Sequence, residues 1–180
     1  MNRLLQKFSI KDLLIIVAMA AIGIAVKPVV VSLAHLVSAP LLIPGGALAG
    51  GLYMMWLVVA VGLIGKRGAA TLCGLVQAIL VLITGIVGSH GVMSLVSYTL
   101  PGLAIDTGLV LMGHRCCCPL CCFVAGMLAN LTGTVTVNWI FFSLPLIPLL
   151  LSLAVAAFSG AMGGLLAWWL LKALARYGIG

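Results

Sequence analysis

The stretch that decides the fold is Lys11 to Val31, KDLLIIVAMAAIGIAVKPVVV. It is long and apolar enough to cross a bilayer, which takes about 20 residues of α-helix. The residues before it are basic, as in a signal peptide, but the apolar run is long, lacks an A-x-A-like cleavage site and continues into Lys27-Pro28. We therefore expect a retained membrane helix around which the rest of the chain packs.

The composition of the chain makes lipid the solvent for most of its side chains. Of 180 residues, 64% are hydrophobic and 6% are charged, and a soluble domain of this length has too little interior to bury so much apolar surface. The net charge of +7 could suggest nucleic acid, but the basic residues stand between apolar runs. We expect them to set membrane topology and expect no nucleic-acid partner.

Turn residues divide the chain into six apolar segments. Pro44-Gly45-Gly46 and Gly65-Lys66-Arg67-Gly68 are two of the breaks. No internal repeat or linker is visible, so we expect one all-α integral membrane domain, residues 1–180, built as a bundle of six transmembrane helices. The expected crossings are residues 11–34, 46–64, 69–87, 92–113, 119–138 and 146–172.

The basic residues predict the orientation of this bundle. Because Lys and Arg concentrate in cytoplasmic connections, the side that carries them is the cytoplasmic side. Eight of the nine fall on one side if there are six crossings, so we expect both termini in the cytoplasm. These eight are Arg3, Lys7, Lys11, Lys66, Arg67, Arg115, Lys172 and Arg176.

Two charged residues stand deep in expected crossings. Lys27 lies about 24 Å along the first helix, so it either snorkels to the outer interface or stands at the mouth of a binding site. Asp106 lies in the fourth crossing, nearer the cytoplasm, where an acid must face the bundle interior or water. A depth difference of about 10 Å argues against a direct salt bridge between them, and Asp106 is either structural or functional.

Other polar and aromatic side chains gather toward the outer half of the bundle. Asn130, Thr134 and Asn138 are spaced four apart and form one polar stripe on the fifth helix. Such a stripe, with a buried Trp and Tyr, could bind a flat, polar small molecule. The candidate binding residues are Lys27, Tyr53, Trp56, Gln77, His90, Tyr98, Asp106, Asn130 and Asn138.

Small residues recur at the spacing that lets helix backbones approach closely. We expect the pairs Gly46-x-x-x-Gly50 and Gly160-x-x-x-Gly164 to pack within the bundle. For the alanine face of the first helix, packing inside the bundle competes with packing against another subunit. That face consists of Ala18, Ala21 and Ala25.

Five of the six cysteines lie within residues 116–122. The spacing Cys118-x-x-Cys121 can chelate a soft metal or hold a thiol pair. No second pair of ligands follows elsewhere, and the expected loop is cytoplasmic, where disulfides are rare. We expect free thiols with no metal and no cofactor, and Cys118 and Cys121 remain weak metal candidates.

Enzyme motifs are absent from the sequence. It has no paired-carboxylate site, no phosphate-binding Gly-rich loop, no metalloprotease signature and no serine elbow. With two acids in the chain, we expect no enzyme activity and no ATP hydrolysis by this polypeptide. A ligand-capturing part of a larger assembly fits these features best.

Six short crossings with both ends cytoplasmic and an Ala-x-x-x-Ala face resemble the substrate-binding S components of energy-coupling-factor (ECF) vitamin transporters. The resemblance covers nearly the whole chain. Nickel and cobalt S components are a poorer match, because they rely on a His next to the initiating Met and this chain has Asn2.

Several local stretches are similar to the hydroxymethylpyrimidine/thiamine type of S component. The stretch from Leu100 to Val110 is one of them, although Asp106 stands where a Glu is expected in that type. The others are Ile43-Pro44-Gly45-Gly46, Gly51-Leu52-Tyr53 with Trp56, Lys66-Arg67-Gly68-Ala69-Ala70 and Gly88-Ser89.

The resemblance implies a division of labour in a prokaryotic plasma membrane. This chain would capture a vitamin or precursor, thiamine or hydroxymethylpyrimidine, while a transmembrane T component and two cytoplasmic ATPases supply the energy. The alanine face would then dock the T component. A cationic thiamine would suit Asp106, whereas Lys27 argues for an anionic or neutral ligand. The alternatives are a solitary small-solute carrier, a metal or thiol protein that uses the cysteine loop, and a purely structural membrane subunit.

Overall fold

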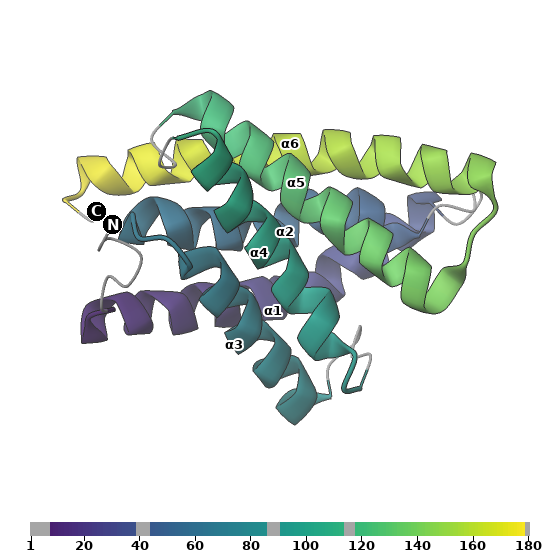
Figure 1. The fold of residues 1–180 in the computed structure, drawn as a ribbon, viewed down its shortest axis with the longest axis horizontal. Coiled ribbons are helices and arrows are strands. Elements are labelled where there is room, and N and C mark those ends of the chain that lie inside the picture. Colours follow the sequence, from purple (N-terminus) through teal and green to yellow (C-terminus); the bar gives the residue numbers. More distant parts are fainter. Residues whose placement is uncertain (1–7, 39–43, 86–90, 114–117, 179–180) are drawn as a thin grey trace.

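The computed structural model describes residues 8–38, 44–85, 91–113 and 118–178 (Figure 1). They form α1 (Ile10–Ser38), α2 (Gly45–Ile64), α3 (Ala69–Thr84), α4 (Ser94–Leu111), α5 (Pro119–Val137), a short π-helix η2 (Asn138–Phe142) and α6 (Leu146–Arg176). Their helical architecture confirms the all-α class.

The six helices differ in their capacity to cross a membrane. Five helical segments are apolar and long enough to span it, whereas α3 is apolar but only 16 residues long. The third expected crossing ran to residue 87, and residues 86 and 87 lie outside the described part of the chain. Length and composition thus establish a membrane-embedded helical protein, and its orientation stays a prediction.

The start of α1 is fixed by a reciprocal cap. The Ser9 N–H donates to Asp12 Oδ2 over 2.7 Å, and the Asp12 N–H donates to Ser9 Oγ over 3.3 Å. This capping box satisfies amides that a helix start leaves unpaired. From there α1 runs without a break through Pro28 to Ser38, and it includes the whole of the crossing expected for residues 11–34.

Glycines bring α2, α5 and α6 into backbone contact. A Cβ atom on Gly163 would stand 2.0 Å from the carbonyl oxygen of Gly51, and one on Gly164 would stand 2.0 Å from that of Cys122. Because no Cβ atom fits at such distances, the helices approach this closely only with glycine there. Gly50 and Gly160 also make close contacts within the bundle, as expected, whereas Gly46 has only the Tyr53 hydroxyl within 4 Å.

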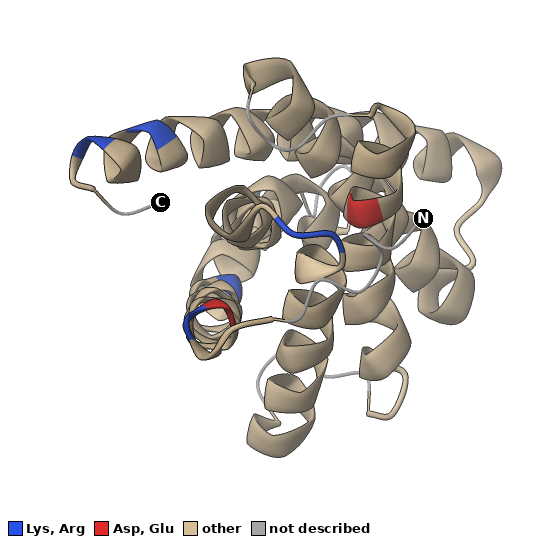
Figure 2. Cartoon of the chain, turned by 60° about the vertical axis from the view of Figure 1, so that its left-hand side comes forward, with Lys and Arg blue, Asp and Glu red and all other residues tan. Residues whose placement is uncertain are grey.

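The described basic residues outside the pocket gather at one end of the molecule. The start of α1, the α2–α3 connection and the end of α6 meet there, and Figures 1 and 2 show these segments at the same end. Lys66 joins two of them through a 2.6 Å ion pair with Asp12. This arrangement agrees with the expected topology, in which the same segments face one side of the membrane.

Candidate ligand pocket

A cavity of about 290 Å³ opens between the helices at the end opposite the basic residues. This volume is close to the lower limit of the about 300–1,000 Å³ typical of small-molecule sites. The cavity is lined by Lys27, Val31, His35, Pro44, Gly45, Gly46, Ala47, Tyr53, Met54, Ser97, Tyr98, Gly133, Thr134, Val137, Asn138, Phe142, Leu144 and Ser152.

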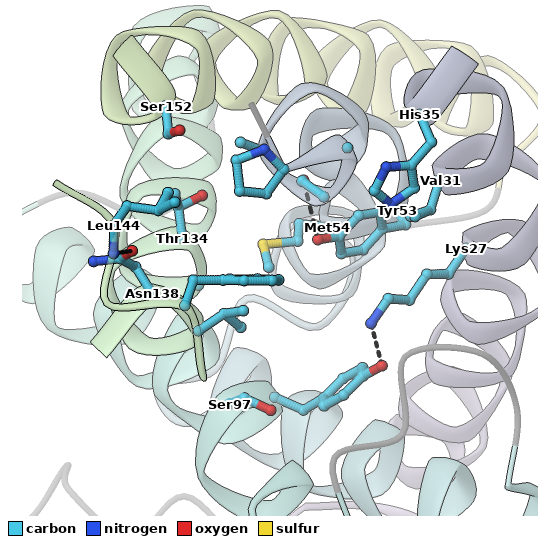
Figure 3. Close-up of a pocket in the computed structure, with 18 residues that line it drawn as sticks. Lys27, Val31, His35, Tyr53, Met54, Ser97, Thr134, Asn138, Leu144 and Ser152 are labelled. Atoms are coloured by element: carbon cyan, nitrogen blue, oxygen red, sulfur yellow. Dashed lines mark hydrogen bonds between the residues drawn. The ribbon is translucent and has the colours of Figure 1, made fainter. Parts of the chain in front are cut away.

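The charged group of the pocket is an amine held by two phenols (Figure 3). Lys27 Nζ donates a hydrogen bond to the Tyr98 hydroxyl. The same nitrogen lies 4.3 Å from the centroid of the Tyr98 ring and 5.3 Å from that of Tyr53, both within the range of cation–π attraction. The Tyr53 hydroxyl in turn donates to the Gly46 carbonyl over 3.3 Å. The lysine therefore points into the cavity, where its charge faces whatever binds.

The opposite wall is shaped by the end of α5. The last turn of this helix widens into the π-helix η2, which closes with Ser143 at a φ of 44° and the Ser143 N–H donating to the Asn138 carbonyl. π-turns are frequent at functional sites because they redirect side chains. Here Asn138 Oδ1 accepts from the Leu144 N–H over 3.0 Å, which ties the chain after η2 to the pocket wall.

Four further polar side chains line the pocket and were not among the predicted site residues, namely His35, Ser97, Thr134 and Ser152. His35 lies against Gly45, where a Cβ atom would come within 2.9 Å of three ring atoms. Ser97 is 5% exposed, and its Oγ has no hydrogen-bond partner among the described residues. A buried hydroxyl without a partner in a cavity wall is available to a ligand. His35 could have been found in the sequence, because Lys27, Val31 and His35 are spaced four apart and share one helix face.

Four of the predicted binding residues, Lys27, Tyr53, Tyr98 and Asn138, line this pocket. Asn130 lies behind the wall, fully buried, and its amide donates to the carbonyls of Ala47 and Ala156, each over 2.9 Å.

Trp56 and Gln77 stand in a different place, against α1. A Cβ atom on Gly23 would lie 2.4 Å from Gln77 Nε2 and 3.5 Å from Trp56 Cδ1. Trp56 Nε1 is buried without a partner among the described residues. Neither side chain lines the pocket, so both sit at a packing contact of α1 with α2 and α3.

Asp106 is held by the start of another helix. Its Oδ2 accepts from the Thr71 N–H over 2.8 Å and from the Thr71 hydroxyl over 2.6 Å. The residue before α3 is Gly68, which has no side chain to cap the helix. Asp106 thus supplies from α4 the carboxylate that a helix start favours. It does not line the pocket.

The remaining predicted residues divide between described and undescribed parts of the chain. His90 lies outside the described residues. Cys118 caps α5, because its Sγ accepts from the Cys121 N–H over 3.2 Å, and hydrogen bonding from Cys121 lowers the pKa of the Cys118 thiol. Within the described residues no three His, Cys, Asp or Glu side chains come together as a metal site would require.

The alanine face of α1 points away from the bundle. Ala18, Ala21 and Ala25 are all exposed, and so are the larger neighbours Leu14 and Val29 on the same face. The small residues therefore do not serve packing within the described chain. They form a shallow apolar strip on the outside of α1.

Fold and pocket together define a helical membrane protein with a cavity at one end. Residues 11–132 match the family described as "ABC-type cobalt transport system, permease component". Since this match covers more than half of the chain, the protein belongs to that family.

A solved structure described as "Crystal structure of an S-component of ECF transporter" has the same fold. It superimposes with a TM-score of 0.77 over 96% of this chain and 88% of that chain, at 19% sequence identity. At this identity the similarity establishes the fold. No curated protein matches the chain.

Proposed function

We propose that this chain is the substrate-capturing S component of an ECF-type ABC importer in a prokaryotic plasma membrane. The observation that carries the proposal is the pocket of about 290 Å³ at the end opposite the basic residues. If the basic end is cytoplasmic, the pocket faces outward, where an importer captures its ligand. The shared fold with an S component and the membership of an ABC transport permease family support the same role.

The proposed partners are a transmembrane T component and two cytoplasmic ATPases. The exposed strip of Ala18, Ala21 and Ala25 supports a docking role, because small side chains let a second helix approach closely in lipid. Larger residues would serve equally well against lipid tails alone. An exposed run of alanines on one face of α1 is therefore better explained by a helix partner than by lipid.

The proposed ligand is a vitamin or precursor, either thiamine or its hydroxymethylpyrimidine precursor. A pyrimidine ring could stack on Tyr53, Tyr98 or Phe142, and its amino and hydroxyl groups could bond to Ser97 and Asn138. The lack of a hydrogen-bond partner for Ser97 Oγ among the described residues supports a polar ligand at that wall.

The name of the family refers to cobalt, but the pocket favours an organic ligand. A divalent transition metal is best held by several imidazole, carboxylate or thiolate groups. The described lining offers one imidazole, that of His35, one thioether, that of Met54, and otherwise hydroxyls, an amide and an amine. The stacking surface of the pocket would also be unused by a bare ion.

Co-purification from native membranes in mild detergent tests the assignment. We expect the tagged chain to co-purify with one polytopic membrane protein and two ATPases. A tagged Ala21→Trp chain is the matched control, because it should lose these partners while remaining folded. Recovery of the wild-type chain alone, still able to mediate uptake without ATP, would instead establish the solitary carrier.

A further inference from the structure

Lys27 has a role in the pocket that goes beyond forming its wall. Its amine is anchored by phenols from two other helices, Tyr53 of α2 and Tyr98 of α4, through a hydrogen bond and two cation–π contacts. A lysine that only snorkelled would extend toward the membrane surface instead. Figure 3 shows the Lys27 side chain reaching from α1 into the cavity, and its dashed line marks the hydrogen bond to a phenol hydroxyl.

No carboxylate is available to balance this charge or that of a ligand. The sequence contains two acidic residues. Asp12 pairs with Lys66 at the basic end, and Asp106 is bonded to Thr71 at the start of α3. Neither lines the pocket, and among the described lining residues the other side chain able to carry a positive charge is His35. A cation entering the pocket would therefore meet a positive charge and no negative one.

The tyrosine rings of the pocket do not make up for the missing carboxylate. A cationic ligand without a carboxylate partner could still be held over tyrosine rings. In this pocket the Lys27 amine already lies over both tyrosines, at 4.3 and 5.3 Å from the ring centroids. A second cation would have to displace it or share those rings with a like charge.

On the basis of the proposed function, we propose that Lys27 selects the ligand by charge. It admits neutral or anionic ring compounds and rejects cationic ones. Of the two proposed ligands, the uncharged hydroxymethylpyrimidine is then the preferred cargo and the thiazolium cation thiamine the poorer one. Lys27 is thus a specificity residue for the pocket, and an anionic substituent would be bound better still.

Binding titrations with charge-matched compounds on the purified full chain test this. The probes are hydroxymethylpyrimidine, thiamine, and deazathiamine, in which a neutral thiophene replaces the thiazolium at the same size. We expect the wild-type chain to bind deazathiamine at least tenfold more tightly than thiamine, which corresponds to about 1.4 kcal/mol. In Lys27→Met the ratio should fall to about one, since Met keeps the length of the side chain without its charge.

Two controls separate selectivity from folding. Lys27→Arg keeps the charge and should keep the tenfold preference. Lys172→Met removes a charge near the end of α6, where its amine lies over Trp168 at 5.1 Å, and should leave the preference unchanged.

Equal or tighter thiamine binding by the wild-type chain would overturn the inference while leaving the proposed function intact. A preference for deazathiamine that survives in Lys27→Met would overturn it as well. Failure of all three compounds to bind the folded chain would overturn the proposed ligand, and this inference with it.

Discussion

Lys27 and Asp106 are both charged residues deep in apolar helices, yet the structure surrounds them differently. Asp106 is satisfied within the protein, by the backbone and the hydroxyl of one residue, Thr71. Among the described residues, the Lys27 amine interacts with the phenols of Tyr53 and Tyr98, and it borders a cavity. Asp106 completes a helix cap and so stabilises the fold, whereas Lys27 faces a cavity with no carboxylate partner among the described residues, which is why we propose that it acts on the ligand.

The same contrast extends to the two halves of the bundle. Near Asp106 and at the glycine contacts of α5 and α6, the helices approach closely and buried apolar side chains form the core. Around Lys27 the helices separate, α5 ends in a π-turn and a buried serine lacks a partner among the described residues. Substitutions of the side chains that line the pocket should therefore affect binding more than stability, and substitutions at the glycine contacts or at Asp106 the reverse.

The largest effect is expected on the exposed alanine strip of α1, which lies away from both the pocket and the glycine contacts. Ala21→Trp should abolish uptake and leave ligand affinity within about twofold, because the bulky ring blocks helix docking without reaching the pocket. Uptake by cells and binding by the purified chain measure the two effects. Ala154→Trp, at an exposed position of α6, is the matched control. Equal loss of binding and uptake in the folded Ala21→Trp chain would contradict a docking role.

The next largest effect should come from filling the pocket. Thr134→Trp places an indole in the cavity and should weaken binding of hydroxymethylpyrimidine more than 100-fold, about 2.7 kcal/mol, with little change in thermal stability. The neighbouring Val135 is 48% exposed on the other side of α5, so Val135→Trp should bind normally. Normal affinity in Thr134→Trp would move the binding site elsewhere.

An effect of comparable size, on stability alone, is expected from the glycines of α2. A Cβ atom on Gly50 would stand 1.7 Å from Asn130 Oδ1, so Gly50→Ala should displace Asn130 from its two carbonyl partners and cost about 3 kcal/mol of unfolding free energy. Gly46→Ala meets only the Tyr53 hydroxyl at 3.7 Å and should cost much less. Unfolding in detergent compares the two. Similar stabilities would contradict the close packing of Asn130.

The smallest effect is expected at Asp106. Asp106→Ala removes the acceptor for two donors of Thr71 and should cost about 2 kcal/mol of unfolding free energy, while Asp106→Asn keeps one acceptor oxygen and should cost less. Ligand affinity should stay within about twofold in both, because the side chain does not line the pocket. A selective loss of affinity in the stable Asp106→Asn chain would mean that this acid acts on the ligand after all.

The helices could be predicted from the sequence because length, apolarity and turn residues decide them locally. The crossing expected for residues 11–34 already ran through Pro28, as α1 does. The π-helix after Val137 could not be predicted, because π-helices are rare and no residue pattern here indicated one. The pocket was predicted in part: Lys27, Tyr53, Tyr98 and Asn138 converge there.

The residue type alone did not indicate which polar residues inside the membrane would face the cavity. Asn130 was expected to belong to one stripe with Asn138, but it points at the carbonyls of Ala47 and Ala156. Asn130 turns to these carbonyls because α2 and α6 both pack against α5 at the position of Asn130. Only the packing of three helices, set by glycines on each, decides it.

Reconstituted vesicles can test whether this chain captures a ligand for partners that supply the energy. Uptake of labelled hydroxymethylpyrimidine would be measured for vesicles containing the purified chain alone and for vesicles containing the chain with its co-purified partners, with and without internal ATP. We expect the chain alone to bind hydroxymethylpyrimidine without accumulating it, and we expect accumulation only with partners and ATP together. Accumulation by the chain alone without ATP would contradict it.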